Sequence, residues 1–444
     1  MNTLIGRSPS AVSRILDSRI PLIALNVLAI VLAARAYAQD ATPNAAGAAN
    51  HLLPMATAAD ARDKTHWHKT MNALPIPAKG CHKATYPQLK WIEVPCTTAR
   101  ETNPTSPSPK VQAAAVGGST PDLAAMRPPG STTTIRQAQG SFDSVVTTGE
   151  TNRSAGPNGV NTRRSEFELQ LNTNTFNSPA CGTVQGCTGW EQFLLNNDPG
   201  SPPAQLQIQS WLLGFLPSGG NCPAPFKPSG SNCFFATAVV NVDIQNIQSL
   251  VTLIMTATAE ANGNDTVSIF GTGEDAIFAV TADSPLSLAP NWTQAEFNVF
   301  GDESRHIAVF DPNSALVVRV TTDIVEGTTQ ETPVPAQVSL TGESNTLSLV
   351  GSGCSIPSPF FAVTFKESNI AGDSYKCPVN PPVLNLCADA TEEVAYDQKA
   401  LSTAQQAFGS PSCAGPESFA CSQTIKSLQQ KLQRDEATKA ADCK

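Results

Sequence analysis

Hydrophobic and polar residues alternate over much of the chain between residues 136 and 370. The segment from Glu166 to Leu171 follows this period of two, with a charged or amide side chain at every second position. The segment 206–211 does the same. Its two faces are Leu206, Ile208 and Ser210 on one side and Gln207, Gln209 and Trp211 on the other. A period of two is typical of β-strands.

Further β-branched and aromatic runs recur at short intervals in this region, separated by turn residues. Two of them, 251–256 and 266–270, flank Asn262-Gly263-Asn264, a sequence that predicts a hairpin turn. Amphipathic helical periods are nearly absent here. We therefore predict a mainly β protein in which residues 136–375 form a two-sheet β-sandwich domain.

The C-terminal segment changes to a helical period. Apolar residues recur at spacings of three, four and seven in two stretches, which are separated by Gly- and Pro-containing sequence near 409–416. The positions concerned are Val394, Ala395, Leu401 and Ala404 in the first stretch and Phe419, Ile425, Leu428 and Leu432 in the second. We predict that residues 385–444 form a helical hairpin.

Residues 39–135 are rich in Ala, Pro, Thr, Ser and Gly. Such a segment buries too little apolar surface to offset the entropy that folding removes. One island, from Cys81 to Cys96, contains Tyr86, Trp91 and Ile92, and this predicts a small disulfide-closed hairpin. The remainder is predicted to be a flexible arm that serves as a pro-region, a spacer or a wrapping segment.

The first 38 residues have the three parts of a signal peptide. Three arginines precede an apolar run from Ile20 to Ala34, and Ala36-Tyr37-Ala38 follows as a cleavage site. The alternative is an uncleaved membrane anchor, but the run is shorter than the ~20 apolar residues that a spanning helix needs. We predict cleavage, no membrane span afterwards, and a secreted protein that is extracellular or periplasmic.

All twelve cysteines lie beyond the signal sequence, and in an exported chain an even number predicts disulfides. Neighbouring cysteines predict four bridges: Cys81–Cys96, Cys181–Cys187, Cys222–Cys233 and Cys354–Cys377. An antiparallel helical hairpin adds Cys387–Cys443 and Cys413–Cys421. Zinc is the alternative, but no C-x-x-C occurs and four of the five histidines lie before residue 100.

Charge and motifs narrow the range of functions. Residues 1–38 hold four of the 28 basic and one of the 37 acidic residues, so the rest of the chain has a net charge of −12. Such a chain is not expected to bind nucleic acid, which needs clustered Lys and Arg. The mature chain contains no P-loop, dinucleotide-binding, nucleophile-elbow or H-E-x-x-H motif. No metal and no cofactor are expected.

The densest group of candidate binding residues lies on two predicted neighbouring strands. It consists of Trp190, Gln192, Gln207, Gln209 and Trp211. Exposed indoles beside amide groups would form a platform that stacks on sugar rings or grips a peptide. Large aromatic side chains also dominate sandwich cores, so burial of both tryptophans is the alternative.

Two resemblances follow from these residues. Gly189-Trp190, the strand with Trp211, and the loop from Cys222 to Cys233 resemble the neprosin-type glutamic endopeptidases over about 50 residues. That resemblance implies a secreted β-sandwich with a pro-region and two catalytic glutamates. The first glutamate of the family falls on Cys187 here. The region 167–369, with FELQLNTNTF, GWEQF, AEFNVFGD and FAVTFKESN, is also similar to uncharacterised secreted bacterial proteins.

The sequence identifies no catalytic residues, although acid–base chemistry would need two carboxyl groups in different environments. Glu191, Glu296 and Asp302 are candidates. Our first hypothesis is an extracellular binding module for a glycan, another surface polymer or a protein. The alternatives are an acid-active glutamic-type endopeptidase with an N-terminal pro-region and a structural envelope or matrix protein.

Overall fold

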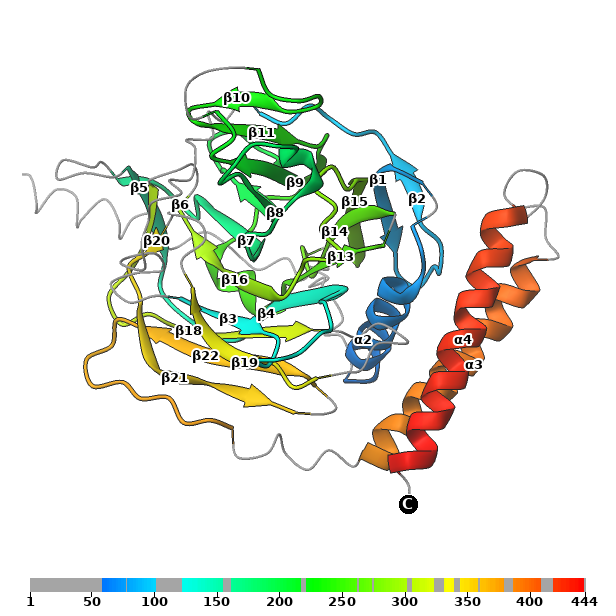
Figure 1. Ribbon diagram of the computed structural model, residues 1–444. Helices are drawn as coiled ribbons and strands as arrows, with labels where there is room; N and C mark the ends of the chain where they lie inside the picture. Colours follow the sequence, from blue (N-terminus) through cyan, green and yellow to red (C-terminus); the bar gives the residue numbers. More distant parts are fainter. Residues whose placement is uncertain are drawn as a thin grey trace, which may run out of the picture. The chain divides into compact units, whose positions relative to one another are not determined.

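The computed structural model describes residues 58–76, 78–100, 122–154, 161–216, 221–261, 263–273, 275–301, 306–322, 331–338, 344–357, 360–378, 386–408 and 418–442. The predicted signal peptide lies outside these residues. Two large sheets, a small sheet and three long helices account for most of the described chain (Figure 1).

The first large sheet has nine strands, and every neighbouring pair in it is antiparallel. In spatial order they are β2 (Ile92–Val94), β1 (Gly80–Thr85), β15 (Ala276–Asp283), β14 (Asn264–Phe270), β13 (Ile254–Ala259), β4 (Gln137–Val146), β18 (Ala315–Thr322), β22 (Ala362–Ser368) and β21 (Ser348–Ile356). The predicted hairpin is present, because β13 and β14 pair from Ala259↔Asp265 onwards.

The second large sheet is also antiparallel. Its spatial order is β10 (Lys227–Ser229), β11 (Asn232–Ala236), β9 (Ala204–Leu213), β8 (Thr188–Asn197), β7 (Phe167–Thr173), β16 (Gln294–Phe300), β3 (Asp122–Met126) and β19 (Val334–Val338), with β12 (Val240–Val242) also on β9. The small sheet contains β20 (Ser344–Asn345), β17 (His306–Phe310), β5 (Glu150–Ser154) and β6 (Asn161–Arg164). Two 3₁₀ turns, η1 (Pro179–Cys181) and η2 (Ile247–Thr252), complete the β region.

The two large sheets pack on one another through a common hydrophobic core. Alternate residues of β7, β8 and β16, such as Leu169, Phe193 and Phe297, enter it fully buried. Phe297 lies over Gly140 of β4, where a Cβ atom would come within 2.1 Å of the ring. A glycine is therefore required at that position for the sheets to approach so closely. The predicted mainly β, two-sheet fold is confirmed.

The N-terminal region differs from the predicted flexible arm wherever it is described. Helix α2 (Ala58–Ala73) buries Trp67 and Met71 completely, and these side chains pack in one cluster with Trp91. Strand β1 adds six residues to the edge of β15. Composition was misleading because the few large apolar residues of this segment gather at one place.

The boundary of the β domain also differs from the prediction. Strand β3 lies inside the second sheet, and Ile135 is fully buried in its core. Together with β1 and β2, the sheets therefore contain residues well before 136, where the sequence placed the boundary.

The C-terminal segment forms the predicted pair of helices, α3 (Leu386–Phe408) and α4 (Ser418–Asp442), which lie side by side (Figure 1). Lys431 of α4 is buried among carboxylates and bonds both oxygens of Asp397 at 2.8 Å. Glu393 of α3 also accepts a hydrogen bond from Lys431, and it faces His66 of α2 at 2.9 Å. Lys69 of α2 pairs with the same carboxylate at 3.1 Å, so side-chain contacts join the hairpin to α2.

Four of the predicted disulfides are present: Cys81–Cys96, Cys181–Cys187, Cys222–Cys233 and Cys354–Cys377. Cys421 is also disulfide-bonded. The nested pairing Cys387–Cys443 and Cys413–Cys421 stays a prediction, because Cys413 and Cys443 lie outside the described residues. Bridges of this kind fit a protein of an oxidising compartment.

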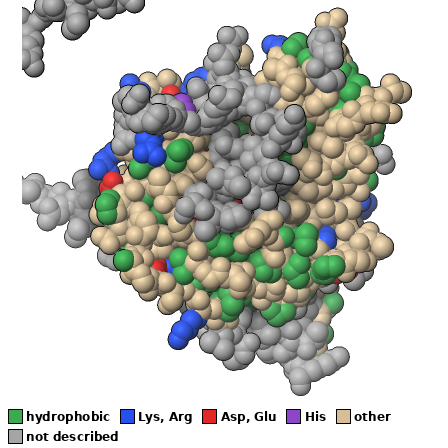
Figure 2. All heavy atoms as spheres, turned by 60° about the vertical axis from the view of Figure 1, so that its left-hand side comes forward, with side chains coloured by type: hydrophobic (Ala, Val, Ile, Leu, Met, Phe, Trp, Pro, Cys, Tyr) green, Lys and Arg blue, Asp and Glu red, His purple; other side chains and the backbone are tan. Residues whose placement is uncertain are grey.

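Among the described residues, no helix combines the length and the apolar character required to cross a membrane. Figure 2 shows basic side chains mostly as separate spots on the face in view. This distribution agrees with the scattered Lys and Arg of the sequence.

Candidate functional site

Four neighbouring strands of the second sheet carry polar residues on the face that points away from the common core. We call this set the polar face. It consists of Glu168, Gln170 and Asn172 of β7, Trp190, Gln192 and Asn196 of β8, Gln205, Gln207, Gln209 and Trp211 of β9, and Glu296 of β16. The strand register aligns Gln209, Gln192, Asn172 and Glu296 in one row across the strands.

The polar face is buried along all four strands, with no member more than 7 % exposed. A buried amide or carboxyl group is costly unless it is hydrogen-bonded. Gln170 supplies part of the bonding: its Oε1 accepts hydrogen bonds from Asn172 and Gln192, and its Nε2 donates to Glu168 at 2.7 Å. The side chains are thereby held in a connected network.

Glu296 is the member of the polar face with the most unusual environment. It is fully buried, and burial raises the pKa of its carboxyl group to about 8, aided by the charge of Glu367. The Nδ2 group of Asn172 donates to Oε2 at 3.1 Å, which opposes part of that rise. Oε1 has no hydrogen-bond partner. Glu296 therefore holds a proton at neutral pH and presents one unpaired oxygen.

Two further buried carboxyl groups lie near Glu296. Asn298 of β16 donates to Oδ2 of Asp122 at 2.7 Å and to Oε2 of Glu367 at 2.9 Å. Burial raises the pKa of both acids, and the charges of Glu367 and Glu296 raise that of Asp122 further. Asp122, Glu296 and Glu367 together form what we call the carboxyl cluster. Ionisation of one member makes ionisation of the others less favourable.

Amide groups complete the chemistry of the polar face. The Oε1 atom of Gln207 is buried and has no hydrogen-bond partner. Gln207 lies in the row of Gln170 and Asn298, next to the row of Glu296. An unpaired amide oxygen and an unpaired carboxyl oxygen on one face offer hydrogen bonds to a polar ligand.

The structure places all five predicted binding residues on the polar face, but it does not expose the indoles. Trp190 and Trp211 are 1 % and 2 % exposed, and they pack with Leu213 in a cluster separate from the common core. Their indole N–H groups donate to Thr173 O at 3.0 Å and to Gln192 Oε1 at 2.9 Å. An exposed aromatic platform is therefore absent at these two residues.

The candidate carboxyl groups have different positions. Glu191 points to the opposite side of β8 from Gln192 and meets Asp265 of the first sheet between the two sheets. Burial raises both pKa values, that of Asp265 to about 6, and Asp265 raises that of Glu191 further. Ser210 donates to Glu191 at 3.3 Å. Asp302 lies outside the described residues.

Sequence analysis missed Glu168, Gln170, Asn172, Asp122 and Glu367. The alternation from 166 to 171 predicts a strand but not the burial of its polar residues, and both faces of β7 are buried. For Gln170 and Asn172 the signal is the repetition of amides at alternate positions in three strands.

The described residues offer poor metal sites. Glu393, Asp397 and Asp435 converge, but the ammonium group of Lys431 occupies the space between them. His68 is buried in α2, stacks on Phe270 and has its pKa lowered to about 3, first by burial and then by Lys69. These groups are explained by packing and charge pairing.

No protein-family model matches the chain, and no curated protein matches it. Among solved structures, it is similar to Scytalido-glutamic peptidase with a peptide-based transition state analog, at 12 % identity over 55 % of this chain and 97 % of that chain, with a TM-score of 0.25. It is also similar to SCP-B, a member of the Eqolisin family of peptidases in complex with the tripeptide Ala-Ile-His, at 11 % identity over 55 % and 97 %, with a TM-score of 0.24. TM-scores of this size do not establish a common fold. The resemblance to secreted bacterial proteins stays a prediction.

Proposed function

We propose that the polar face is the catalytic face of an acid-acting endopeptidase. The observation that carries this proposal is Glu296, a fully buried acid with a pKa of about 8 and an oxygen that no side chain satisfies. A carboxyl group that stays protonated can donate a proton to a reacting oxygen or nitrogen. Glu296 is thus suited to act as a general acid.

The substrate class is inferred from the amides around Glu296. Each Gln or Asn side chain offers one acceptor and two donors, the groups that an extended peptide also presents along its backbone. A row of amides across β7, β8 and β9 could therefore bind a peptide strand and orient its carbonyl groups. Gln207 and Gln192 would polarise the carbonyl group under attack.

Glu168 does not serve as the immediate partner of Glu296. Its oxygens accept hydrogen bonds from Gln170 and Asn196 at 2.7 and 3.0 Å. The reason is distance, because the register places Glu168 opposite Phe300, four residues along β16 from Glu296. At ~3.4 Å per residue this is roughly 14 Å along the strand, too far for the two groups to share one water molecule. The acids nearest to Glu296 are those of the carboxyl cluster.

We also propose that the region before residue 122 acts as a pro-region of an exported protein. The last described residue before residue 122 is Arg100, whose backbone N–H donates to Gln205 of the polar face at 3.0 Å. The chain is next described at Asp122, beside Asn298. These two contacts lie on opposite sides of the strands that carry the polar face. A cut between residues 100 and 122 therefore tests whether the N-terminal region inhibits that face.

The test uses a denatured protein as substrate at pH 3 to 5, before and after cleavage at a protease site engineered between residues 100 and 122. We expect cleavage of the substrate to rise after the cut and to fall at least 100-fold in Glu296→Gln. Glu191→Gln is the matched control, because this glutamate is equally buried but points to the core. Activity that survives Glu296→Gln and is lost in Glu191→Gln would refute the assignment.

A second candidate is the extracellular binding module, favoured by the connected amide network on the polar face. In that case the same preparation would bind a polysaccharide or a peptide without cleaving it. Binding would weaken in Gln192→Ala and persist in Glu296→Gln. A structural envelope or matrix protein would show neither property.

A further inference from the structure

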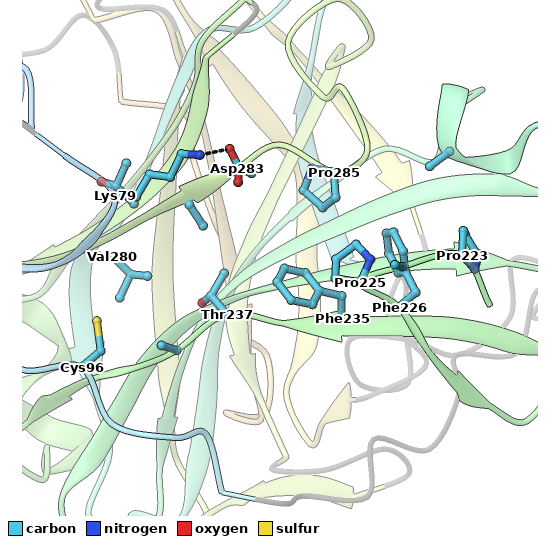
Figure 3. Close-up of a pocket in the computed structure, with 16 residues that line it drawn as sticks. Lys79, Cys96, Pro223, Pro225, Phe226, Phe235, Thr237, Val280, Asp283 and Pro285 are labelled. Carbon is cyan, nitrogen blue, oxygen red and sulfur yellow. Dashed lines mark ion pairs between the residues drawn. The ribbon is translucent and has the colours of Figure 1, made fainter. Parts of the chain in front are cut away.

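A cavity of about 640 Å³ lies apart from the polar face. Strands β1 and β15 of the first sheet form one side, and β11 with the loop after Cys222 forms the other (Figure 3). Phe235 of β11 pairs with Ser210, so its side chain leaves the sheet on the side opposite to Trp211 and the polar face. The volume lies within the range of small-molecule sites.

The walls of the cavity are almost entirely apolar. Phe226 and Phe235 meet edge to face with their ring centroids 6.2 Å apart, and prolines surround them (Figure 3). The prolines are Pro223, Pro225 and Pro285. Proline rings and packed aromatic rings have few rotamers, so these walls lose little conformational entropy when a ligand binds.

Three disulfides lie at or next to lining residues of the cavity. Cys96 lines it, Cys222 precedes the lining residue Pro223, and Cys181 follows the lining residue Ala180. Each of these cysteines is in a closed bridge. A cavity held in this way keeps its shape without a ligand, which is the condition for pre-organised binding.

The polar groups of the cavity are already used. Lys79 and Asp283 form an ion pair at one end, and they are the only charged residues that line it in the described chain (Figure 3). The hydroxyl groups of Thr237 and Thr281 are bonded to the Ile208 N–H and to Thr266. A ligand therefore meets no net charge and few free hydrogen-bonding groups.

We propose that this cavity binds an uncharged, largely apolar small molecule. The apolar lining supplies affinity by burial, at roughly 25 cal/mol per Å² of apolar surface. Lys79 and Asp283 neutralise each other at one end, so a ligand needs no charge to bind there. The site is independent of the polar face and remains valid if the endopeptidase proposal fails.

The experiment titrates the purified chain with Nile red, an uncharged fluorescent probe. We expect saturable binding with a stoichiometry near one, and competition by 1-dodecanol. Ala282→Phe places a ring inside the cavity and should weaken binding at least tenfold. Ala371→Phe is the matched control, because Ala371 is exposed in a turn that does not line the cavity. It should bind the probe as the parent chain does.

A second variant covers the case in which Ala282→Phe fails to fold, as judged by its circular dichroism and thermal melt. Phe235→Ala removes apolar contact surface from a wall and introduces no bulk that could prevent folding, and it should weaken probe binding at least threefold. The proposal is overturned if the parent chain shows no saturable binding. It is also overturned if the folded cavity variants bind the probe as tightly as Ala371→Phe.

Discussion

The two faces of the second sheet differ in chemistry although the same strands build them. The face toward the first sheet carries Leu169, Phe193 and Phe297, and the other carries Gln170, Gln192 and Glu296. Both sets are buried. Burial of apolar side chains stabilises the fold, whereas burial of amides and acids costs free energy unless each group is bonded. The polar face is thus the part of the sheet that stability alone does not explain.

The largest effect on stability is expected on the core face. Phe297→Ala removes a ring that fills the space over Gly140, and the sheets cannot close fully around the void. The free energy of unfolding should decrease by about 3–5 kcal/mol, as for other buried aromatic residues. Urea denaturation at pH 5 measures it. A loss below about 1 kcal/mol would show that the packing of the two sheets does not depend on Phe297.

The next largest effect is expected in the pH dependence of stability, which arises from buried carboxyl groups. The folded chain retains protons on Asp265 and Glu296, with pKa values of about 6 and 8, whereas the unfolded chain releases them above pH 4 to 5. Raised pKa values of acids mean that stability is full at low pH and is lost as pH rises through these values. We expect the urea midpoint to decrease between pH 5 and 8. The corresponding decrease in unfolding free energy is on the order of a few kcal/mol.

The contribution of Glu296 to this loss can be isolated. Glu296→Gln keeps the shape of the protonated acid and cannot ionise, so its midpoint should decrease less than that of the parent chain between pH 5 and 8. A profile identical to that of the parent would show that Glu296 is not protonated in the folded state.

The smallest effect on stability is expected at Gln207. Its buried Oε1 atom has no partner, so Gln207→Leu removes an unsatisfied group and should change the unfolding free energy by less than about 1 kcal/mol. Activity or ligand binding should nevertheless fall at least tenfold. Thermal melts and the substrate assay test the two statements together. A strongly destabilised variant would mean that Gln207 serves the fold.

The sequence predicted the general fold from two signals, the period of hydrophobic residues and the spacing of cysteines. Both signals are local. A period of two in residues 166–171 and 206–211 marks strands, and adjacent cysteines mark bridges such as Cys222–Cys233. The carboxyl cluster could not be predicted in this way. Asp122, Glu296 and Glu367 are separated by up to 245 positions and meet only through sheet pairing and the bonds of Asn298. Burial of Trp190 likewise depends on tertiary contacts.

The four bridges with two described cysteines share an order along the chain. Each cysteine of residues 81–377 is joined to the next one in sequence, over separations of 15, 6, 11 and 23 residues. Eight cysteines allow 105 different pairings. Pairing of each cysteine with its nearest neighbour in sequence is the result expected when pairs oxidise in chain order. These four bridges can therefore form without reshuffling by thiol–disulfide exchange.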